Sequence, residues 1–247
     1  MNQSEAREHV WSELIKVAKP DSRFHLNFKE FIPDFAGSED ATKRLTNLDI
    51  YQNAKTIFIT PDNCLENLRA QTLRDNKTQI ITTYGIRRGF VVLERKDVPS
   101  GFEDYAVLLD AIEGLGKTIS LQELKSNYSL DLIVTGASAV NYAGVRFGKG
   151  HGFFDLEWAM FYQLGIANQD TPIVAFVHDY QLVNIDLSVN PFDTLCDYIV
   201  TPTQTIHVPN PQKPDTGVIW EKLEPGMFNE ISPLRELKEM ERLGQLT

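Results

Sequence analysis

Four short apolar runs, each the length of a strand, most strongly limit the folds open to this chain. They occupy residues 56–60, 78–83, 131–135 and 171–177. A helical pattern over residues 63–75 separates the first two runs, which makes a β-α-β unit with a right-handed crossover. Strands that alternate with helices predict an α/β domain with a mostly parallel sheet and flanking helices.

The remaining segments supply further expected elements. Apolar spacing predicts helices at residues 4–18, 38–48, 105–113, 154–164 and 233–246, and strands at residues 90–93 and 198–200. Ser38 is the expected N-cap of the second helix, because its hydroxyl can accept a hydrogen bond from a free backbone N–H. The chain shows no internal repeat and no low-complexity stretch, so we expect a single domain over residues 1–247.

Charge and composition exclude several classes of function. The chain is 42% hydrophobic and has a formal net charge of -10. Nucleic acid is therefore not an expected partner, because binding its phosphates needs clustered Lys and Arg. No apolar run is long enough to span a membrane, and the N-terminus lacks the apolar run of a signal peptide, so we expect no membrane partner and a cytoplasmic location. Cys64 and Cys196 lack metal-ligand spacing and are expected to be reduced.

A glycine-rich segment between a strand and a helix, residues 136–152, is the strongest candidate for a binding site. Four of its glycines are Gly144, Gly148, Gly150 and Gly152. Backbone N–H groups in such a loop, and the N-terminus of the following helix, attract anions. Arg146 and Lys149 add two positive charges. The segment predicts a phosphate-binding loop. The alternative is that the glycines only turn the chain, since the pattern is neither a Walker loop nor a Rossmann fingerprint.

Two polar residues near this segment each have two interpretations. Asp155 lies at the expected N-cap of its helix, and capping requires no ligand; the functional interpretation is a carboxylate that holds Mg²⁺ against phosphates. His178 directly follows the strand at 171–177, whose carboxyl end should face a ligand crevice. It is either part of a polar pocket wall or part of a turn with Asp179 as a cap.

The residues from Gly144 to Asp155 also resemble the signature of a known enzyme family. They read Gly-Val-Arg-Phe-Gly-Lys-Gly-His-Gly-Phe-Phe-Asp. This run is similar to the G-x-R-[LI]-G-[RK]-G-G-G-[YF]-[YF]-D signature of the 5-formyltetrahydrofolate cyclo-ligases, also called methenyltetrahydrofolate synthetases. Residues 7–11, 32–35, 179–183 and 197–202 resemble a divergent branch, the methenyltetrahydrofolate-synthetase-domain-containing proteins.

The resemblance implies a Rossmann-like fold of the isomerase and coenzyme-A-transferase type. It also implies an ATP- and Mg²⁺-dependent ligase that converts 5-formyltetrahydrofolate, a small-molecule substrate, to 5,10-methenyltetrahydrofolate. Carried over to this chain, Arg146 and Lys149 are catalytic residues that hold phosphates, and Asp155 binds Mg²⁺. The implied nucleotide-binding residues are Arg7, Gly148, Lys149, Gly150, His151 and Gly152, and the implied substrate-binding residues are Phe153, Phe154 and His178.

Four positions depart from the family pattern. Phe153 and Phe154 stand where the family usually has Tyr, His151 stands in place of a Gly, and Leu156 stands in place of an Arg. Loss of an Arg beside phosphates weakens the stabilisation of transition-state charge unless another cation substitutes. Two alternatives therefore stay open. One is the same fold acting on a different phosphorylated or formylated metabolite, as in cofactor salvage, and the other is a non-catalytic protein that binds nucleotide or folate.

Overall fold

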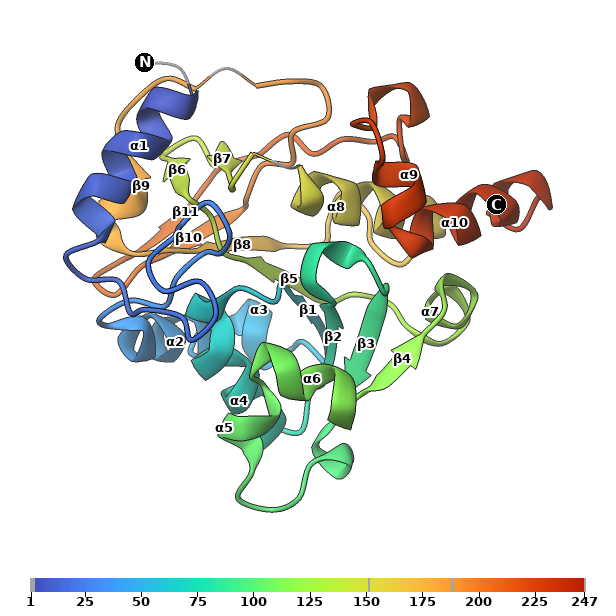
Figure 1. Cartoon of the computed structure of the whole chain (residues 1–247), viewed down its shortest axis with the longest axis horizontal. Helices are drawn as coiled ribbons and strands as arrows, with labels where there is room; N and C mark the ends of the chain where they lie inside the picture. Colours follow the sequence, from blue (N-terminus) through green and yellow to red (C-terminus); the bar gives the residue numbers. More distant parts are fainter. Residues whose placement is uncertain (1–2, 151, 188, 247) are drawn as a thin grey trace.

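The computed structural model describes residues 3–150, 152–187 and 189–246, and a large sheet lies at its centre (Figure 1). Across the sheet the strands are β11 (Thr205–His207), β10 (Tyr198–Val200), β8 (Ile173–Phe176), β5 (Leu132–Thr135), β1 (Thr56–Ile59), β2 (Thr78–Thr82), β3 (Phe90–Leu93) and β4 (Lys117–Ile119). The strands from β10 to β2 run parallel, while β11, β3 and β4 pair antiparallel at the edges. The predicted α/β class with a mostly parallel sheet is confirmed.

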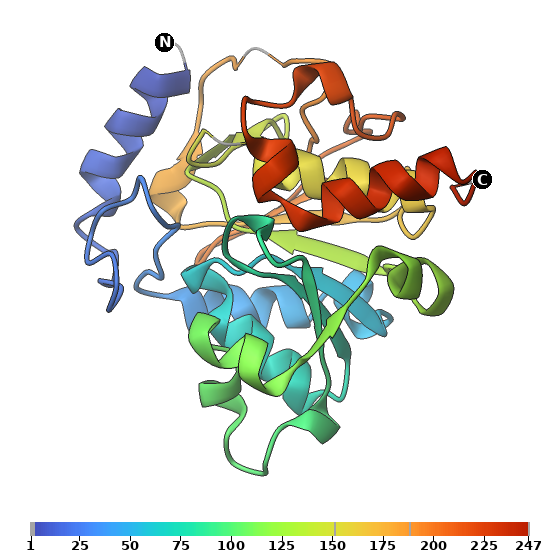
Figure 2. The ribbon, with the colours of Figure 1, turned by 45° about the vertical axis from the view of Figure 1, so that its right-hand side comes forward.

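Helices cover both faces of the sheet, as Figures 1 and 2 show. They are α1 (Gln3–Leu14), α2 (Ser38–Thr46), α3 (Asp49–Gln52), α4 (Glu66–Arg74), α5 (Glu103–Ala106), α6 (Leu109–Leu115), α7 (Leu121–Asn127), α8 (Phe153–Leu164), α9 (Met227–Glu230) and α10 (Ser232–Arg242). One face is covered by α2, α4, α5 and α6, and the other by α7, α8 and α10. Among the described residues, no helix is both long and apolar enough to cross a membrane.

The central strands are buried on both faces, which explains why their sequences are unbroken apolar runs. On β1, Phe58 points to the α8 face, where its ring meets that of Phe161 with centroids 4.7 Å apart. Ile57 and Ile59 point to the opposite face and pack in the same cluster as Leu45 of α2. This double-sided core fixes the carboxyl ends of β1, β2 and β5 along one edge.

A second, small sheet was not predicted from the sequence. It contains β6 (Ala139–Asn141), β7 (Arg146–Phe147) and β9 (Leu182–Val183), with β6 in the middle. Strands this short leave no periodic signal in a sequence. Ala6 and Val10 of α1 pack against Phe147 and Ala139 of this sheet. The glycine-rich segment is therefore a β-hairpin, made by β6 and β7, followed by a short loop that enters α8.

Several predicted boundaries are wrong for identifiable reasons. The expected helix at 105–113 is split into α5 and α6, because Leu108 between them has an extended backbone with ψ 142°. The first helix ends at Leu14 rather than at residue 18, and the last ends at Arg242. Ser38 is not an N-cap: Gly37 occupies that position, and the Ser38 hydroxyl accepts a hydrogen bond from Asn67 at 3.1 Å.

Arg69 of α4 holds the turn that follows β1, and it generates a prediction about stability. Its side chain is fully buried and donates hydrogen bonds to the carbonyls of Thr60 (2.8 Å), Asp62 (3.0 Å) and Val107 (3.2 Å). We expect Arg69→Met to lower the free energy of unfolding by about 3 kcal/mol, because these carbonyls lose a buried donor. Urea unfolding followed by circular dichroism measures the loss.

The same helix offers a matched control. Arg74 is partly exposed and pairs with Asp104 at 2.6 Å. Since exposed ion pairs add little stability, we expect Arg74→Met to cost less than about 1 kcal/mol. Equal losses in the two variants would contradict the structural role given to Arg69.

Candidate functional site

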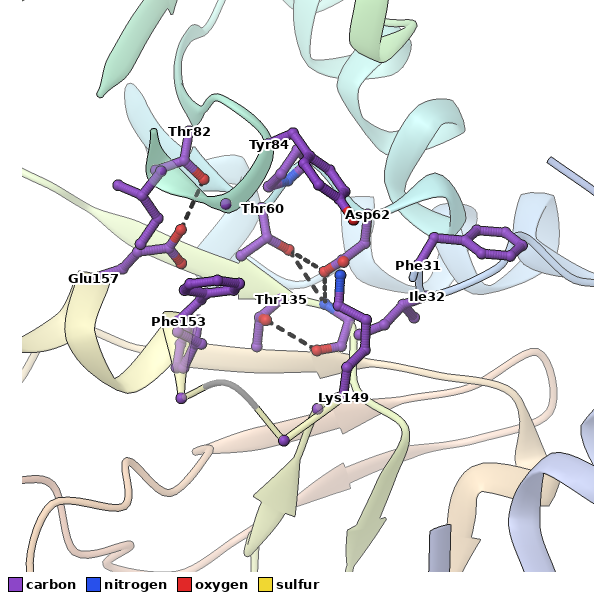
Figure 3. Close-up of a pocket in the computed structure, with 18 of the residues that line it drawn as sticks. Phe31, Ile32, Thr60, Asp62, Thr82, Tyr84, Thr135, Lys149, Phe153 and Glu157 are labelled. Carbon is purple, nitrogen blue, oxygen red and sulfur yellow. Dashed lines mark hydrogen bonds between the residues drawn. The ribbon is translucent and has the colours of Figure 1, made fainter. Parts of the chain in front are cut away.

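A cavity of about 230 Å³ opens at the carboxyl ends of β1, β2 and β5 (Figure 3). This is the edge at which parallel α/β sheets generally bind ligands. Residues 60–63, 82–86 and 135–136 line it from the three strand ends, and residues 146–150 and 152–155 line it from the hairpin and α8. The cavity therefore collects segments that lie far apart in the sequence.

Asp62 forms a polar wall of the cavity together with Thr60. The Thr60 hydroxyl donates to Oδ2 of Asp62 at 2.6 Å, and the backbone N–H of Gly136 donates to the same oxygen at 3.1 Å. A Cβ atom on residue 136 would lie 2.9 Å from this oxygen, so glycine is required for the close approach. Asp62 is not among the candidate site residues predicted from the sequence. Its place directly after a buried strand was the signal that could have identified it.

Cationic side chains also line the cavity. Nζ of Lys149 donates to the carbonyl of Glu30 at 2.9 Å and lies 5.3 Å from the centroid of the Tyr84 ring. Nε of Arg7 donates to the carbonyl of Gly148 at 3.0 Å. Burial lowers the pKa of both Lys149 and Arg7 from their ordinary values.

The structure brings most of the implied nucleotide-binding residues to this one cavity. Those that line it are Arg7, Gly148, Lys149, Gly150 and Gly152. Residue 151, the histidine of the same set, lies outside the described residues. An anion in the cavity would meet the Arg7 and Lys149 side chains and the N-terminus of α8 together.

The buried Arg146 and the half-buried Asp155 form an ion pair that ties β7 to α8. Nη2 of Arg146 lies 2.8 Å from Oδ1 of Asp155, and the backbone N–H of Thr194 donates to the same oxygen at 2.9 Å. The Arg146 side chain is 3% exposed, and its guanidinium carbon lies 3.9 Å from the centroid of the Phe154 ring. Nε of Arg146 has no hydrogen-bond partner in the described part of the chain.

The interpretation of Asp155 as an N-cap is wrong. Gly152 caps α8 in a left-handed conformation with φ 64°, and Asp155 is the third residue of the helix. A carboxylate there still faces the positive end of the helix. Within residues 3–150, 152–187 and 189–246, no group of three His, Cys, Asp or Glu side chains is arranged to hold a metal ion. The metal role of Asp155 therefore stays a prediction.

The three implied substrate-binding residues are not all brought together. Phe153 and Phe154 both line the cavity, and Phe154 is buried beneath Arg146. His178 does not line it. Its Nδ1 accepts a hydrogen bond from the backbone of Tyr180 at 3.1 Å, and its ring meets the Phe35 ring edge-on at 5.4 Å.

The chain is similar over most of its length to proteins of one known family. A model of the 5-formyltetrahydrofolate cyclo-ligase family matches residues 2–202. The chain belongs to this family. Methenyltetrahydrofolate synthase domain-containing proteins of Mus musculus and Homo sapiens are 32% and 30% identical over 237 and 243 residues. These alignments cover 96% and 98% of this chain but 63% of each relative, so the chain spans under two thirds of their length.

A solved structure shares the fold of this chain. An NMR structure of Aquifex aeolicus 5,10-methenyltetrahydrofolate synthetase matches with a TM-score of 0.52 at 15% identity, covering 86% of this chain and 96% of that one. The predicted resemblance and fold class are thus confirmed. Membership of the cyclo-ligase family supports a ligase-like enzyme.

Glu157 of α8 is a cavity residue that the sequence analysis missed as a site residue. Its side chain is 2% exposed, Oε1 accepts a hydrogen bond from the Thr82 hydroxyl at 2.7 Å, and Oε2 has no partner among the described residues. Burial raises the pKa of Glu157 to about 8, and the negative charges of Asp62 and Asp155 act in the same direction. An acid within the mostly apolar sequence of α8, after Asp155 in its first turn, was the available signal.

Glu157 also generates a prediction about stability and pH. Since its pKa is raised by folding, the unfolded chain ionises first, and the stability contributed by the neutral group is lost as pH rises from about 4.5 to about 8. Glu157→Gln keeps the shape but does not titrate. We therefore expect the free energy of unfolding of the wild type, relative to that of the variant, to rise by roughly 3 kcal/mol as the pH is lowered from 8 to 5. Urea unfolding at each pH measures this difference. A difference that does not change with pH would contradict the raised pKa.

Proposed function

We propose that this chain catalyses the ATP- and Mg²⁺-dependent conversion of 5-formyltetrahydrofolate to 5,10-methenyltetrahydrofolate. The observation that carries the proposal is that one cavity combines a cationic glycine loop with an aromatic wall, on a chain of the cyclo-ligase family. The first feature suits a polyphosphate, and the second suits a flat heterocycle. Their adjacency suits a phosphoryl transfer from one ligand to the other.

The phosphates of ATP fit the loop end of the cavity. Lys149 and Arg7 supply charge, and α8 directs the free N–H groups of its first turn toward the same space. Arg7 also fixes the loop, because it donates to the carbonyl of Gly148. In this assignment Arg7 and Lys149 bind the phosphates, and the ion-paired Arg146 stabilises the charge that develops during transfer.

Magnesium fits this site as a complex with ATP rather than as a tightly held protein metal. Mg²⁺ commonly takes one or two carboxylates, with phosphate oxygens and water as its other ligands. Asp155 uses Oδ1 for its two hydrogen bonds, so Oδ2 is the oxygen that this assignment gives to the ion. When bound, Mg²⁺ would neutralise phosphate charge.

The heterocycle of the folate fits the aromatic end. The rings of Phe24 and Tyr84 stack with centroids 5.6 Å apart, and Phe153 lines the same cavity. Aromatic faces bind flat rings and exclude water from the reacting group. In the proposed reaction the γ-phosphoryl group passes to the formyl oxygen on N5. N10 then attacks the formyl carbon and loses its proton, and phosphate leaves with ADP as the other product.

The direct test is turnover. Purified protein is mixed with Mg-ATP and 5-formyltetrahydrofolate, and the absorbance of 5,10-methenyltetrahydrofolate is followed with time. ATP-dependent formation of the product supports the proposal. Binding of both ligands without turnover would contradict it.

Lys149 provides a prediction for the loop end. We expect Lys149→Ala to weaken ATP binding about tenfold in calorimetry, because a partly desolvated cation facing the phosphates is lost. Lys43→Ala is the matched control, since Lys43 is exposed on α2 and pairs only with the neighbouring Asp40 at 3.0 Å in the described structure. An unchanged ATP affinity in Lys149→Ala would remove the loop from the nucleotide site.

Asp155 provides a prediction for the metal. We expect Asp155→Asn to raise the Mg²⁺ concentration needed for half-maximal turnover severalfold, because the ion loses a carboxylate ligand. The variant should also lose about 3 kcal/mol of stability, because the buried Arg146 charge loses its partner. Lower stability with an unchanged Mg²⁺ requirement would restrict Asp155 to the ion pair.

A second candidate function is supported by one observation. Arg146 and Asp155 neutralise each other, and Leu156, where the family has Arg, is buried in the core. These features reduce the positive charge available to a transition state. They favour a protein that binds nucleotide or folate without turnover, and the turnover assay separates the two functions.

A further inference from the structure

A second cavity of about 240 Å³ adjoins the first. The two cavities share the lining residues Gly150, Gly152, Asp155 and Phe192. The two glycines and Asp155 belong to the loop end of the first cavity, where the proposed function places the phosphates. The residues of the aromatic end, which are Phe24, Tyr84 and Phe153, do not line the second cavity. The second cavity therefore continues the loop end of the first.

The walls of the second cavity are mainly apolar. Leu156 and Ala159 line it from α8. The segment that leads into α9 adds the side chains of Val218, Ile219, Leu223 and Met227. Ligand pockets are generally lined by such side chains, which favour the burial of apolar ligand surface.

The segment that closes the cavity is fixed to α8. The indole N–H of Trp158 donates to the carbonyl of Pro214 at 2.9 Å, and the backbone N–H of Val218 donates to Oε1 of Gln163 at 3.0 Å. Figures 1 and 2 both show α9, at the end of this segment, beside α8. The cavity is thus held open between two elements that are bonded to each other.

Leu156 links this cavity to a departure from the family pattern. It stands where the family usually has an Arg, its side chain is 8% exposed, and it packs in the same cluster as Val218. A cation among these apolar side chains would need a partner. Residues 214–227 of the lining also lie outside residues 2–202, the region that the family model matches. The apolar cavity is therefore made by a substitution and by a segment that are not part of the family pattern.

We propose that the second cavity binds the purine base of the nucleotide whose phosphates occupy the glycine loop. The inference rests on the proposed function and deepens it, because it gives the nucleotide a base subsite. Pockets that hold a whole drug-sized ligand span roughly 300–1,000 Å³, so this cavity suits one ring system. Phe192 lines both cavities and is 40% exposed, so its ring is available to a flat base.

The charges around the second cavity favour a neutral base over an acidic group. In the described structure, the charged side chains that line it are the carboxylates of Asp155 and Glu224 and the ammonium of Lys222. The carboxylate-bearing arm of a folate, or a further phosphate, would enter surroundings with an excess of negative charge. A neutral purine carries no such cost.

The test compares ATP with inorganic tripolyphosphate, which carries the phosphates without the base, by calorimetry at one Mg²⁺ concentration. Ala159 is partly buried and lines the second cavity but not the first. In Ala159→Phe the added ring fills the cavity. We expect ATP to bind about tenfold more weakly, because the base loses its apolar contacts. The affinities for tripolyphosphate and 5-formyltetrahydrofolate should not change.

Two control variants separate the base from the phosphates. Ala159→Ser adds one oxygen at the same position and leaves the cavity open, so its ATP affinity should stay within about twofold of the wild type. Lys149→Ala should weaken the binding of ATP and tripolyphosphate alike, because both lose the same cation. A loss confined to ATP is thus specific to the second cavity.

Leu223→Ala tests the same cavity if Ala159→Phe does not fold. Leu223 is partly buried in the segment that faces α8 across the cavity. Its truncation removes apolar contacts without filling space, and we expect ATP to bind about threefold more weakly and tripolyphosphate to bind as in the wild type. Cooperative urea unfolding shows which variants are folded.

The outcomes separate the base subsite from the proposed function. A wild-type ATP affinity in folded Ala159→Phe overturns the base subsite and leaves the proposed function standing. An equal loss for ATP and tripolyphosphate, or a loss for 5-formyltetrahydrofolate alone, overturns the base subsite as well. A wild-type protein that binds no ATP overturns both proposals.

Discussion

The ion pair of the buried Arg146 with Asp155 is the interaction on which the shape of the site depends. It joins β7 to the first turn of α8, so the loop between them is held at both ends. Because Arg146 is almost fully buried, removal of its partner would leave a charge without compensation. The Phe154 ring covers the guanidinium, and the N–H of Thr194 donates to the same carboxylate oxygen. The geometry of the glycine loop is thus a consequence of packing and charge at its two ends.

Much of the fold could be predicted from the sequence because its central strands are buried on both faces. In a chain where such runs alternate with helices, an apolar run such as the one at 131–135 predicts a buried strand of a parallel sheet. The elements that could not be predicted lack such apolar runs. The strands β6, β7 and β9 have two or three residues each, and only tertiary contacts, such as those of α1, specify them. The local sequence pattern does not predict such contacts.

In the site too, residues that are close in sequence could be predicted together, whereas residues that are far apart in sequence could not. Arg146, Lys149 and their glycines are neighbours in sequence, so their grouping could be predicted. Asp62 and Glu157 enter the cavity from a strand end and from a helix, and only the fold brings them together. Asp155 was misplaced as a cap because the helix begins at Phe153, after a glycine that can adopt a left-handed conformation. His178 follows the right strand but is occupied by its own turn and by Phe35.

The segment beyond residue 202, which the family model does not match, also supports the loop. Trp158 of α8 donates from its indole N–H to the carbonyl of Pro214 at 2.9 Å, and the buried Lys213 pairs with Asp197 at 2.8 Å. Residues 214–227 also close a second cavity of about 240 Å³, which shares Gly150, Gly152, Asp155 and Phe192 with the first. Since α8 carries Asp155 and Glu157, anything that fixes this helix fixes both. The segment therefore influences the site through its contacts with α8. Substitutions in this segment can change the surroundings of the loop, while the residues that line the first cavity stay the same.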